Sequence, residues 1–245
     1  MSAQLDSHSY FDAMEATIRQ DATNPWIEAF CQRAMMMRAY SVRNVALILS
    51  QFPEATYVAG RSQFKEEGIA VLPGATPIYI TAPRANHAEA QAGGFSWATV
   101  YDVSQTSARP SRHRKKGAAE YLQRVVRLTK QAGINVVSAN LTNGAWKVLE
   151  GTTLYLKKGV APELAFQLIC HELAYWALVK EGAAARLAFS LAAIVSYSVG
   201  VGLGLPMPNL SPQHKLVACE GAKLLSNMDR SIKVAKRLLS AVKKA

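Results

Sequence analysis

Cationic side chains are the first residues in this sequence whose type and spacing suggest chemistry. Five of them lie within residues 107–117, a stretch with no apolar side chain large enough to anchor a core: Arg109, Arg112, Arg114, Lys115 and Lys116. Guanidinium and ammonium groups at this density can neutralise phosphate groups, and affinity from such contacts falls as salt is added. A solvated linker that binds nothing explains the same composition equally well, so both interpretations stay open.

The charge of the whole chain indicates the same class of partner. Its 28 Lys and Arg residues exceed its 17 Asp and Glu residues, and the formal net charge is +11. We therefore expect a polyanionic partner, either nucleic acid or an anionic membrane surface, with simple solubility as the alternative. The three cysteines are too few and too widely spaced for a disulfide framework, and none forms a CxxC pair. This usage suits a reducing cytoplasm, and we expect no signal peptide because the N-terminus lacks a basic segment followed by an apolar one.

The elements that must position these groups fall into two parts. Apolar side chains recur at three-to-four spacing in residues 10–48, which predicts helices. Short β-prone runs at residues 55–59, 78–82 and 95–103 predict a small sheet after them. Because the basic stretch interrupts these patterns, we expect a first domain at residues 1–108, a basic linker at 109–117 and a second domain at 118–245.

The second part is predicted to be mostly helical. Helices are expected over residues 118–131, 163–179 and 213–242, with strands at 135–137 and 152–156. Residues 188–205 carry no charge and approach the length of a membrane span, but their Ser and Gly residues favour a buried helix and no membrane partner. The last helix has an apolar stripe and a basic face, which is typical of a docked helix, with membrane or nucleic-acid contact as the alternative. The fold class is therefore α+β.

Several segments between residues 40 and 106 resemble a known family. Tyr40-Ser41-Val42-Arg43-Asn44-Val45-Ala46-Leu47-Ile48 is followed by Gln51-Phe52-Pro53-Glu54-Ala55-Thr56-Tyr57-Val58-Ala59-Gly60, then by Gly74, Pro77-Ile78, Ala82-Pro83 and Tyr101-Asp102-Val103-Ser104-Gln105-Thr106. Their order and spacing resemble the single-stranded-DNA-binding domain of the ArdC-type antirestriction proteins carried by plasmids and phages. The chain departs from that pattern at Phe64, where the family usually has Trp, and at Gly68-Ile69, where it usually has Gly-Arg.

The resemblance implies that the first domain binds single-stranded DNA, and suitable side chains are present. Exposed aromatic residues such as Tyr40, Tyr57, Phe64 and Tyr79 would stack on unpaired bases, at about 1 to 3 kcal/mol each. Basic residues would neutralise the backbone and amides would contact bases or phosphates. The residues expected in this interface are Tyr40, Arg43, Asn44, Gln51, Tyr57, Arg61, Phe64, Lys65, Arg84, Gln105, Arg112, Arg114 and Lys115. The alternative is structural: some aromatics pack in the core, and Asn44 and Gln105 tie loops together.

The family's second domain resembles a zinc metallopeptidase, in which an HExxH helix and a later acidic residue hold the metal. Histidines four residues apart share a helix face and clasp zinc, while the Glu polarises the attacking water. The corresponding residues here are His171-Glu172-Leu173-Ala174-Tyr175, and Ala193 stands at the acidic position. Because two of three ligands are absent, the resemblance implies a zincin-like domain without zinc or peptidase activity, in which His171 and Glu172 are remnants.

Two interpretations of this former pocket remain open. A hydrogen bond from the Tyr175 hydroxyl to His171 would satisfy the remaining polar groups. Alternatively, a metal site could be rebuilt from His171, Tyr175 and either His214 or Glu220, and zinc would then be a cofactor. Without it, no cofactor is expected.

The sequence therefore predicts a cytoplasmic single-stranded-DNA-binding protein of a mobile element, with an antirestriction or DNA-protective role. A host restriction or defence protein is a second candidate partner. Two other functions are kept as alternatives: a metalloprotease with an altered metal site, and an inhibitor of a host defence complex that does not bind DNA.

Overall fold

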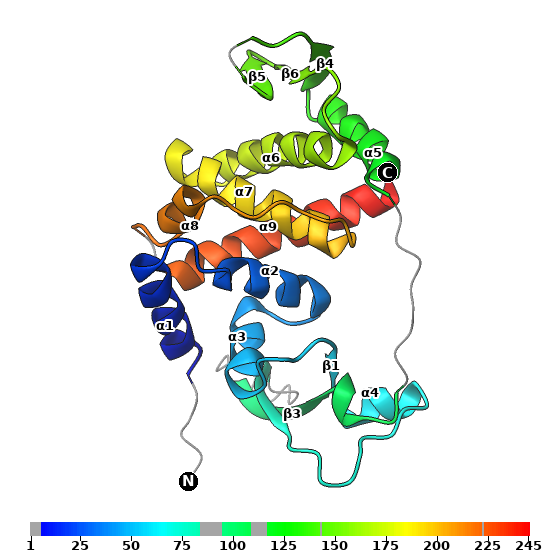
Figure 1. Cartoon of the computed structure of the whole chain (residues 1–245). Coiled ribbons are helices and arrows are strands. Elements are labelled where there is room, and N and C mark those ends of the chain that lie inside the picture. Colours follow the sequence, from blue (N-terminus) through cyan, green and yellow to red (C-terminus); the bar gives the residue numbers. More distant parts are fainter. Residues whose placement is uncertain (1–5, 84–94, 109–116, 143, 222) are drawn as a thin grey trace. The chain divides into compact units, whose positions relative to one another are not determined.

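The computed structural model describes residues 6–83, 95–108, 117–142, 144–221 and 223–245 (Figure 1). The chain forms two compact units. The first comprises Met1–Ala16 and Met36–His113, and the second comprises Thr17–Met35 and Arg114–Ala245. Each unit combines helices with one three-stranded sheet, so the predicted α+β class is confirmed.

The division between the units differs from the sequence boundary in one segment. Residues 17–35 were expected in the first domain, but they belong to the second unit. Helix α2 (Trp26–Met36) is held there by a buried ion pair of 2.9 Å between Glu28 and Lys215. Gln32 of the same helix donates to the Tyr197 hydroxyl at 2.9 Å. These contacts join residues far apart in the sequence, so local patterns could not reveal them.

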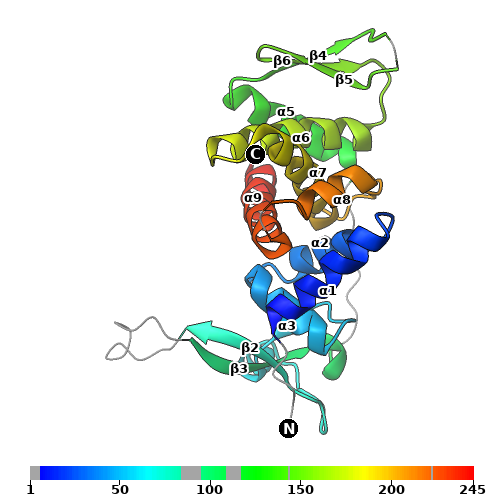
Figure 2. The same cartoon turned by 90° about the vertical axis from the view of Figure 1, so that its left-hand side faces the viewer.

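The first unit contains helices α3 (Val42–Gln51) and α4 (Arg61–Glu66), and α1 (Ser7–Gln20) begins in it. Its strands are β1 (Val58–Ala59), β2 (Ile78–Pro83) and β3 (Phe95–Asp102), followed by the short helix η2 (Val103–Gln105). The strand order is β1-β3-β2, with both pairings antiparallel. Strands β2 and β3 form a long ribbon (Figure 2). On one side of the ribbon, Ile78, Ile80 and Val100 enter the core.

Two amide side chains of α3 pair with the free edge of β2. Asn44 donates from Nδ2 to the Thr81 carbonyl at 2.8 Å, and its Oδ1 accepts from the Thr81 N–H at 3.0 Å. Gln51 makes the same two contacts with Tyr79, at 2.8 and 2.9 Å. The two amides are about two turns apart on one helix face, and their partners alternate along the strand. They therefore replace a neighbouring strand and block an open sheet edge.

A buried carboxylate organises the other end of this sheet. Asp102 Oδ2 accepts from the backbone N–H groups of Thr56 and Tyr57, at 2.6 and 3.1 Å. Its Oδ1 caps η2 by accepting from the Ser104 N–H, and Gln105 completes a capping box by accepting from the Asp102 N–H at 2.9 Å. The loop before β1 and the turn after β3 are thereby fixed together.

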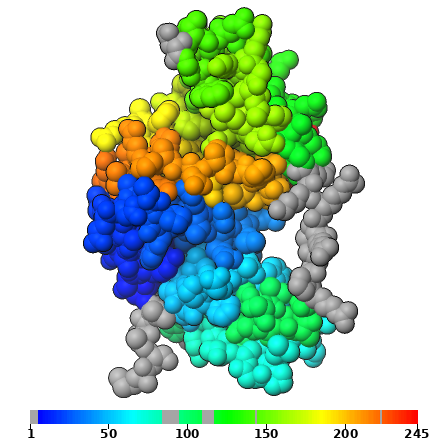
Figure 3. All heavy atoms as spheres, in the orientation of Figure 1, coloured from blue at the N-terminus to red at the C-terminus, as the bar shows by residue number. Residues whose placement is uncertain are grey.

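The second unit has a helical core with a sheet on one side. Its helices are α2, α5 (Ala118–Gln131), α6 (Pro162–Lys180), α7 (Ala185–Gly202), α8 (Pro212–Ala218) and α9 (Leu224–Lys244). Its strands are β4 (Asn135–Ala139), β5 (Lys147–Glu150) and β6 (Thr153–Lys157), in the order β4-β6-β5. Helix α7 packs against α6, α8 and α9, and α8 reaches the surface of the unit (Figure 3).

Helix α7 contains the uncharged run noted in the sequence. Among the described helices it is the one with the length and hydropathy of a membrane span, and 67% of it is buried inside the unit. Its small residues permit close packing, since a Cβ on Gly202 would lie 3.0 Å from Leu239 and 3.1 Å from Met35. The predicted burial of this helix is confirmed.

Several predicted elements match and others need correction. Helix α5 has the predicted bounds, and Gly133 follows it with φ of 79°. The single helix expected over residues 213–242 is instead two helices, because Gly221 adopts φ of 69° between α8 and α9. Helix α4 and strand β5 were not predicted, since both are too short to show a clear period.

The α3 amides give the first prediction. Asn44→Ala leaves the Thr81 N–H and carbonyl without partners, so we expect the free energy of unfolding to fall by about 1 to 3 kcal/mol. Amide hydrogen exchange at Thr81 should accelerate selectively, as measured by NMR alongside urea denaturation. The matched control is Gln63→Ala, an exposed amide of the same unit whose hydrogen bonds span 3.3 and 3.4 Å. Equal losses in the two variants would contradict the edge-pairing role.

Candidate nucleic-acid interface and His171 pocket

One face of the β1-β3-β2 sheet carries exposed aromatic side chains. The register pairs Thr81 with Trp97, and directly paired residues point to the same side of a sheet. Side chains two positions apart on a strand also point to the same side. Tyr79 lies two residues before Thr81, and Phe95 lies two residues before Trp97, so both share that side with Trp97. Their exposed fractions are 45%, 65% and 52% for Tyr79, Phe95 and Trp97. We call these three residues the aromatic face.

Helix α4 extends this side of the sheet with a cation. Tyr101, two positions beyond Thr99 on β3, is buried against Phe64 and Ala59. The exposed Arg61 lies over the Tyr101 ring at 4.9 Å from its centroid, and its guanidinium donates to the Tyr101 hydroxyl at 3.3 Å. A positive charge is thus fixed on the side of the sheet that bears the aromatic face.

The structure places several expected interface residues in structural roles instead. Phe64 was expected to be exposed, but it is fully buried because it is the core-facing residue of α4. Asn44 and Gln51 pair with β2, and Gln105 donates to the Thr76 carbonyl besides capping η2. Tyr40 donates its hydroxyl hydrogen to the Val58 carbonyl at 3.0 Å. The structural alternative therefore describes Phe64, which packs in the core, and the polar groups of the other four residues.

The other expected residues divide into two groups. Arg43, Tyr57, Arg61 and Lys65 are exposed in the first unit. Arg84, Arg112, Arg114 and Lys115 lie outside the described residues. Sequence reasoning missed Phe95 and Trp97, although the spacing of aromatics at 95, 97 and 101 on a predicted strand was the signal that could have identified them.

In the second unit, α6 presents the remnant motif to a lysine of β5. Lys147 Nζ lies 3.2 Å from His171 Nδ1 and forms an ion pair with Glu172. His171 Nε2 lies 3.1 Å from the Phe189 carbonyl oxygen, an acceptor, so Nε2 carries the ring hydrogen. Lys147 is paired with the buried Leu156 of β6, and directly paired residues point to the same side of a sheet. The Lys147 side chain therefore points to the side of the sheet that faces the core.

Burial and charge set the protonation states of this pocket. Burial lowers the pKa of His171, and the ammonium of Lys147 adds to that effect, which favours a neutral imidazole that accepts at Nδ1. Burial alone would raise the pKa of Glu172, but the neighbouring His171 and Lys147 outweigh it and hold that pKa below its usual value. Burial raises the pKa of the adjacent Cys170 thiol to about 12, so it is no nucleophile. The pocket pairs one ammonium with one carboxylate.

These residues do not fit a zinc site. A metal needs the lone pair of an imidazole and the negative charge of a carboxylate, and here Lys147 engages both. The expected Tyr175 to His171 hydrogen bond is wrong, since His171 uses Lys147 and Phe189 while the Tyr175 ring packs edge-on against Trp176. Within the described part of the chain, no three His, Cys, Asp or Glu side chains are grouped to hold a metal ion.

The residues proposed for a rebuilt site have other contacts. His214 packs against Phe189 with ring centroids 5.7 Å apart, and its Nδ1 contacts the Ser211 hydroxyl at 3.0 Å. Glu220 accepts from Arg186 at 3.2 Å. Ala193 is 5% exposed on α7, where a methyl group suits the apolar packing.

Comparisons with known proteins identify the family. Residues 10–131 match the family model described as the N-terminal domain of anti-restriction factor ArdC. The crystal structure of the antirestriction protein ArdC from plasmid R388, in its metal-free form, is similar with a TM-score of 0.60 and 17% identity, over 97% of this chain and 98% of that chain. Its Mn(II)-bound structure gives a TM-score of 0.58 and 17% identity, over 97% and 95%.

At that identity the two structures establish a shared fold, and a comparison with curated proteins gave no match. The matched region contains the aromatic face and every resembling segment between residues 40 and 106, so the predicted resemblance to the family is confirmed. The chain belongs to the ArdC-type antirestriction protein family.

Proposed function

We propose that this protein binds single-stranded DNA through its aromatic face and acts in the cytoplasm as an antirestriction or DNA-protective protein of a mobile element. The observation that supports it is the gathering of Tyr79, Phe95 and Trp97 on one exposed side of a sheet, the side to which α4 adds Arg61. Large aromatic side chains grouped at a surface usually mark a binding site. Base stacking contributes about 1 to 3 kcal/mol per ring.

The geometry favours unpaired bases over a duplex. A flat ring binds the face of a base, and in a duplex these faces are covered by neighbouring bases while the grooves present only edges. Phe95 and Trp97 are two residues apart on one strand, which separates them by about 6.5 Å, enough for each to contact a different base. Aromatic side chains on a sheet are used in this way by common single-strand-binding modules.

The charge of the chain supports the same partner. A formal net charge of +11 attracts a polyanion over distances comparable with the Debye length, about 10 Å at 0.1 M salt. Arg61 places one guanidinium on the side of the sheet that bears the aromatic face, and the exposed Arg43 and Lys65 add positive charge to the same unit. Affinity should therefore combine stacking, which salt changes little, with phosphate neutralisation, which salt weakens.

For the second unit we propose a peptidase-like domain without peptidase activity. The observation behind this is the position of Lys147, whose ammonium contacts both His171 Nδ1 and the Glu172 carboxylate. In an HExxH enzyme, the corresponding carboxylate must accept a proton from a metal-activated water. Here its charge is already paired with an ammonium, and the two other ligand positions hold Tyr175 and Ala193. The unit would serve as a scaffold or as a surface for a host protein.

The aromatic face gives the second prediction. We expect Tyr79→Ala, Phe95→Ala and Trp97→Ala each to weaken binding of a labelled single-stranded oligonucleotide by about 1 to 3 kcal/mol, because each removes one stacking surface. Fluorescence anisotropy at two salt concentrations, with a duplex of the same sequence for comparison, measures this loss of affinity. The control is Trp146→Ala, since Trp146 is 50% exposed in the second unit.

Three results would count against this site: no binding at low salt, a preference for the duplex, or an equal loss from Trp146→Ala. If the protein failed to bind DNA at low salt but captured a host defence protein, and this capture survived nuclease treatment, the inhibitor interpretation would replace DNA binding.

The His171 pocket gives the third prediction. Protein stripped with a chelator and dialysed against Zn(II) or Mn(II) should retain less than one equivalent by elemental analysis, and His171→Ala should not change that content. Lys147→Met should lower the free energy of unfolding by about 3 kcal/mol, since it leaves the buried Glu172 carboxylate without its counter-charge. A Lys147→Met/Glu172→Gln variant should recover part of that loss. Stoichiometric metal that disappears in His171→Ala would revive the metalloprotease.

A further inference from the structure

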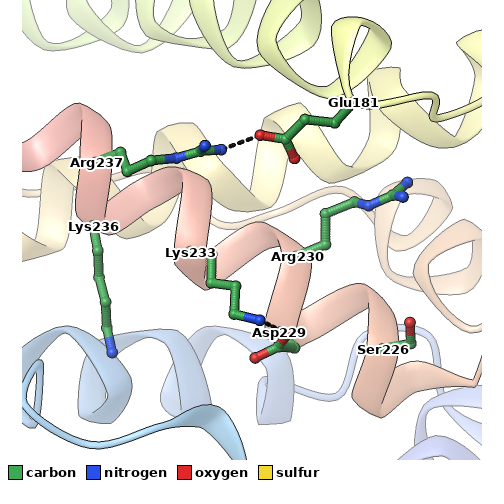
Figure 4. A pocket seen from close by; sticks show the side chains of 7 residues that line it. All are labelled: Glu181, Ser226, Asp229, Arg230, Lys233, Lys236 and Arg237. Atoms are coloured by element: carbon green, nitrogen blue, oxygen red, sulfur yellow. Dashed lines mark hydrogen bonds and ion pairs between the residues drawn. The ribbon is translucent and has the colours of Figure 1, made fainter.

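Helix α9 and the end of α6 form a pocket that the proposed function does not use. Its volume is about 550 Å³, and its lining residues are Glu181, Ser226, Asp229, Arg230, Lys233, Lys236 and Arg237 (Figure 4). All but Glu181 recur at three-to-four spacing on α9, so they lie along one side of that helix. The opposite side is buried, with Met228, Ile232 and Leu239 in the core, which makes α9 a fixed platform.

The pocket carries an excess of positive charge. Its four basic side chains face two acidic ones, and each acid is already paired: Asp229 with Lys233 at 2.6 Å, and Glu181 with Arg237. The Arg230 side chain is half-buried and makes no hydrogen bond or ion pair with any other residue that the structure describes. In Figure 4 its guanidinium lies apart from both ion pairs. A partly desolvated guanidinium with open donors is a binding group for an oxyanion.

The positive surface continues beyond this pocket. A second hollow of about 260 Å³ shares Glu181 and Arg237 with it and is also lined by Lys180. Lys180 is exposed and likewise has no ion pair to another described residue. A chain of anions could therefore contact Arg230 in the first hollow and Lys180 in the second. An extended phosphodiester strand has this repeating charge, whereas a single small anion would use only one hollow.

We propose that this surface, defined by Lys180, Arg230 and Arg237, is a second nucleic-acid contact that binds backbone phosphates without reading bases. The proposal rests on the proposed function, since it assigns a further site on the same strand. Arginine suits the role because its planar fork donates two parallel hydrogen bonds to one phosphate. The hollows lack exposed aromatic rings among their lining residues, so the expected contribution is electrostatic.

The salt dependence of single-strand binding separates this site from the aromatic face. Each lost phosphate contact on a single strand should make the slope of log K against log salt less negative by about 0.7. Arg230→Glu should therefore weaken binding of a long oligonucleotide several-fold at low salt and flatten the slope, while Arg230→Lys should weaken it less. Trp97→Ala should lower affinity without changing the slope. The matched control is Lys130→Glu, an exposed cation of α5 with the same charge reversal.

Each outcome decides a different question. Binding that depends on Trp97 but shows equal slopes for Arg230→Glu, Lys130→Glu and the unmodified protein would overturn the second contact and leave the proposed function intact. Absence of any single-strand binding would overturn both. If poly-glutamate of matched charge competed as well as the oligonucleotide, with the same dependence on Arg230, the phosphate assignment would be wrong and the surface would bind acidic chains in general.

Discussion

The antiparallel pairing of β2 with β3 determines which side chains of the first unit meet water. Side chains alternate along a strand, so burial of Ile78, Ile80 and Val100 commits the opposite residues to the other face. A register shift of one residue would exchange the two sets. The α3 amides oppose such a shift because they recognise the backbone of Tyr79 and Thr81 at fixed positions. The exposure of the aromatic face thus follows from the ladder and its blocked edge.

In the second unit, the corresponding constraint is the cost of a buried carboxylate. Glu172 is 5% exposed, and an unpaired charge at that depth would be strongly unfavourable. In a metallopeptidase the corresponding carboxylate faces a metal-bound water, but here the positions aligned with two metal ligands hold Tyr175 and Ala193. The ammonium of Lys147 provides the compensating charge instead. Lys147 therefore accounts for how the chain keeps Glu172 buried while Tyr175 and Ala193 stand at the ligand positions: without a metal, the carboxylate needs another cation beside it.

Sequence patterns predicted the elements whose formation depends on interactions between residues close together in the sequence. Helix α5 follows from its apolar periodicity, and strand β2 follows from a short β-prone run that ends at Pro83. Burial of individual residues did not follow, because it depends on partners distant in sequence. Phe64 looked like a stacking residue and is buried by Ala59 and Tyr101, while Phe95 and Trp97 looked like ordinary strand residues and are exposed. The same reason hid Lys147, whose partners lie 24 and 25 positions away.

These corrections change the kind of recognition that the first unit can offer. The sequence suggested amide groups that hydrogen-bond to bases, but the amides of Asn44, Gln51 and Gln105 all serve the backbone of the fold. The candidate contact residues that remain exposed in the first unit are aromatic or cationic, and such groups contact every base or phosphate alike. Under the proposed function, the protein would thus bind strands of many sequences. That property suits protection of DNA whose sequence is not known in advance, since coverage then depends on strandedness rather than on a recognition site.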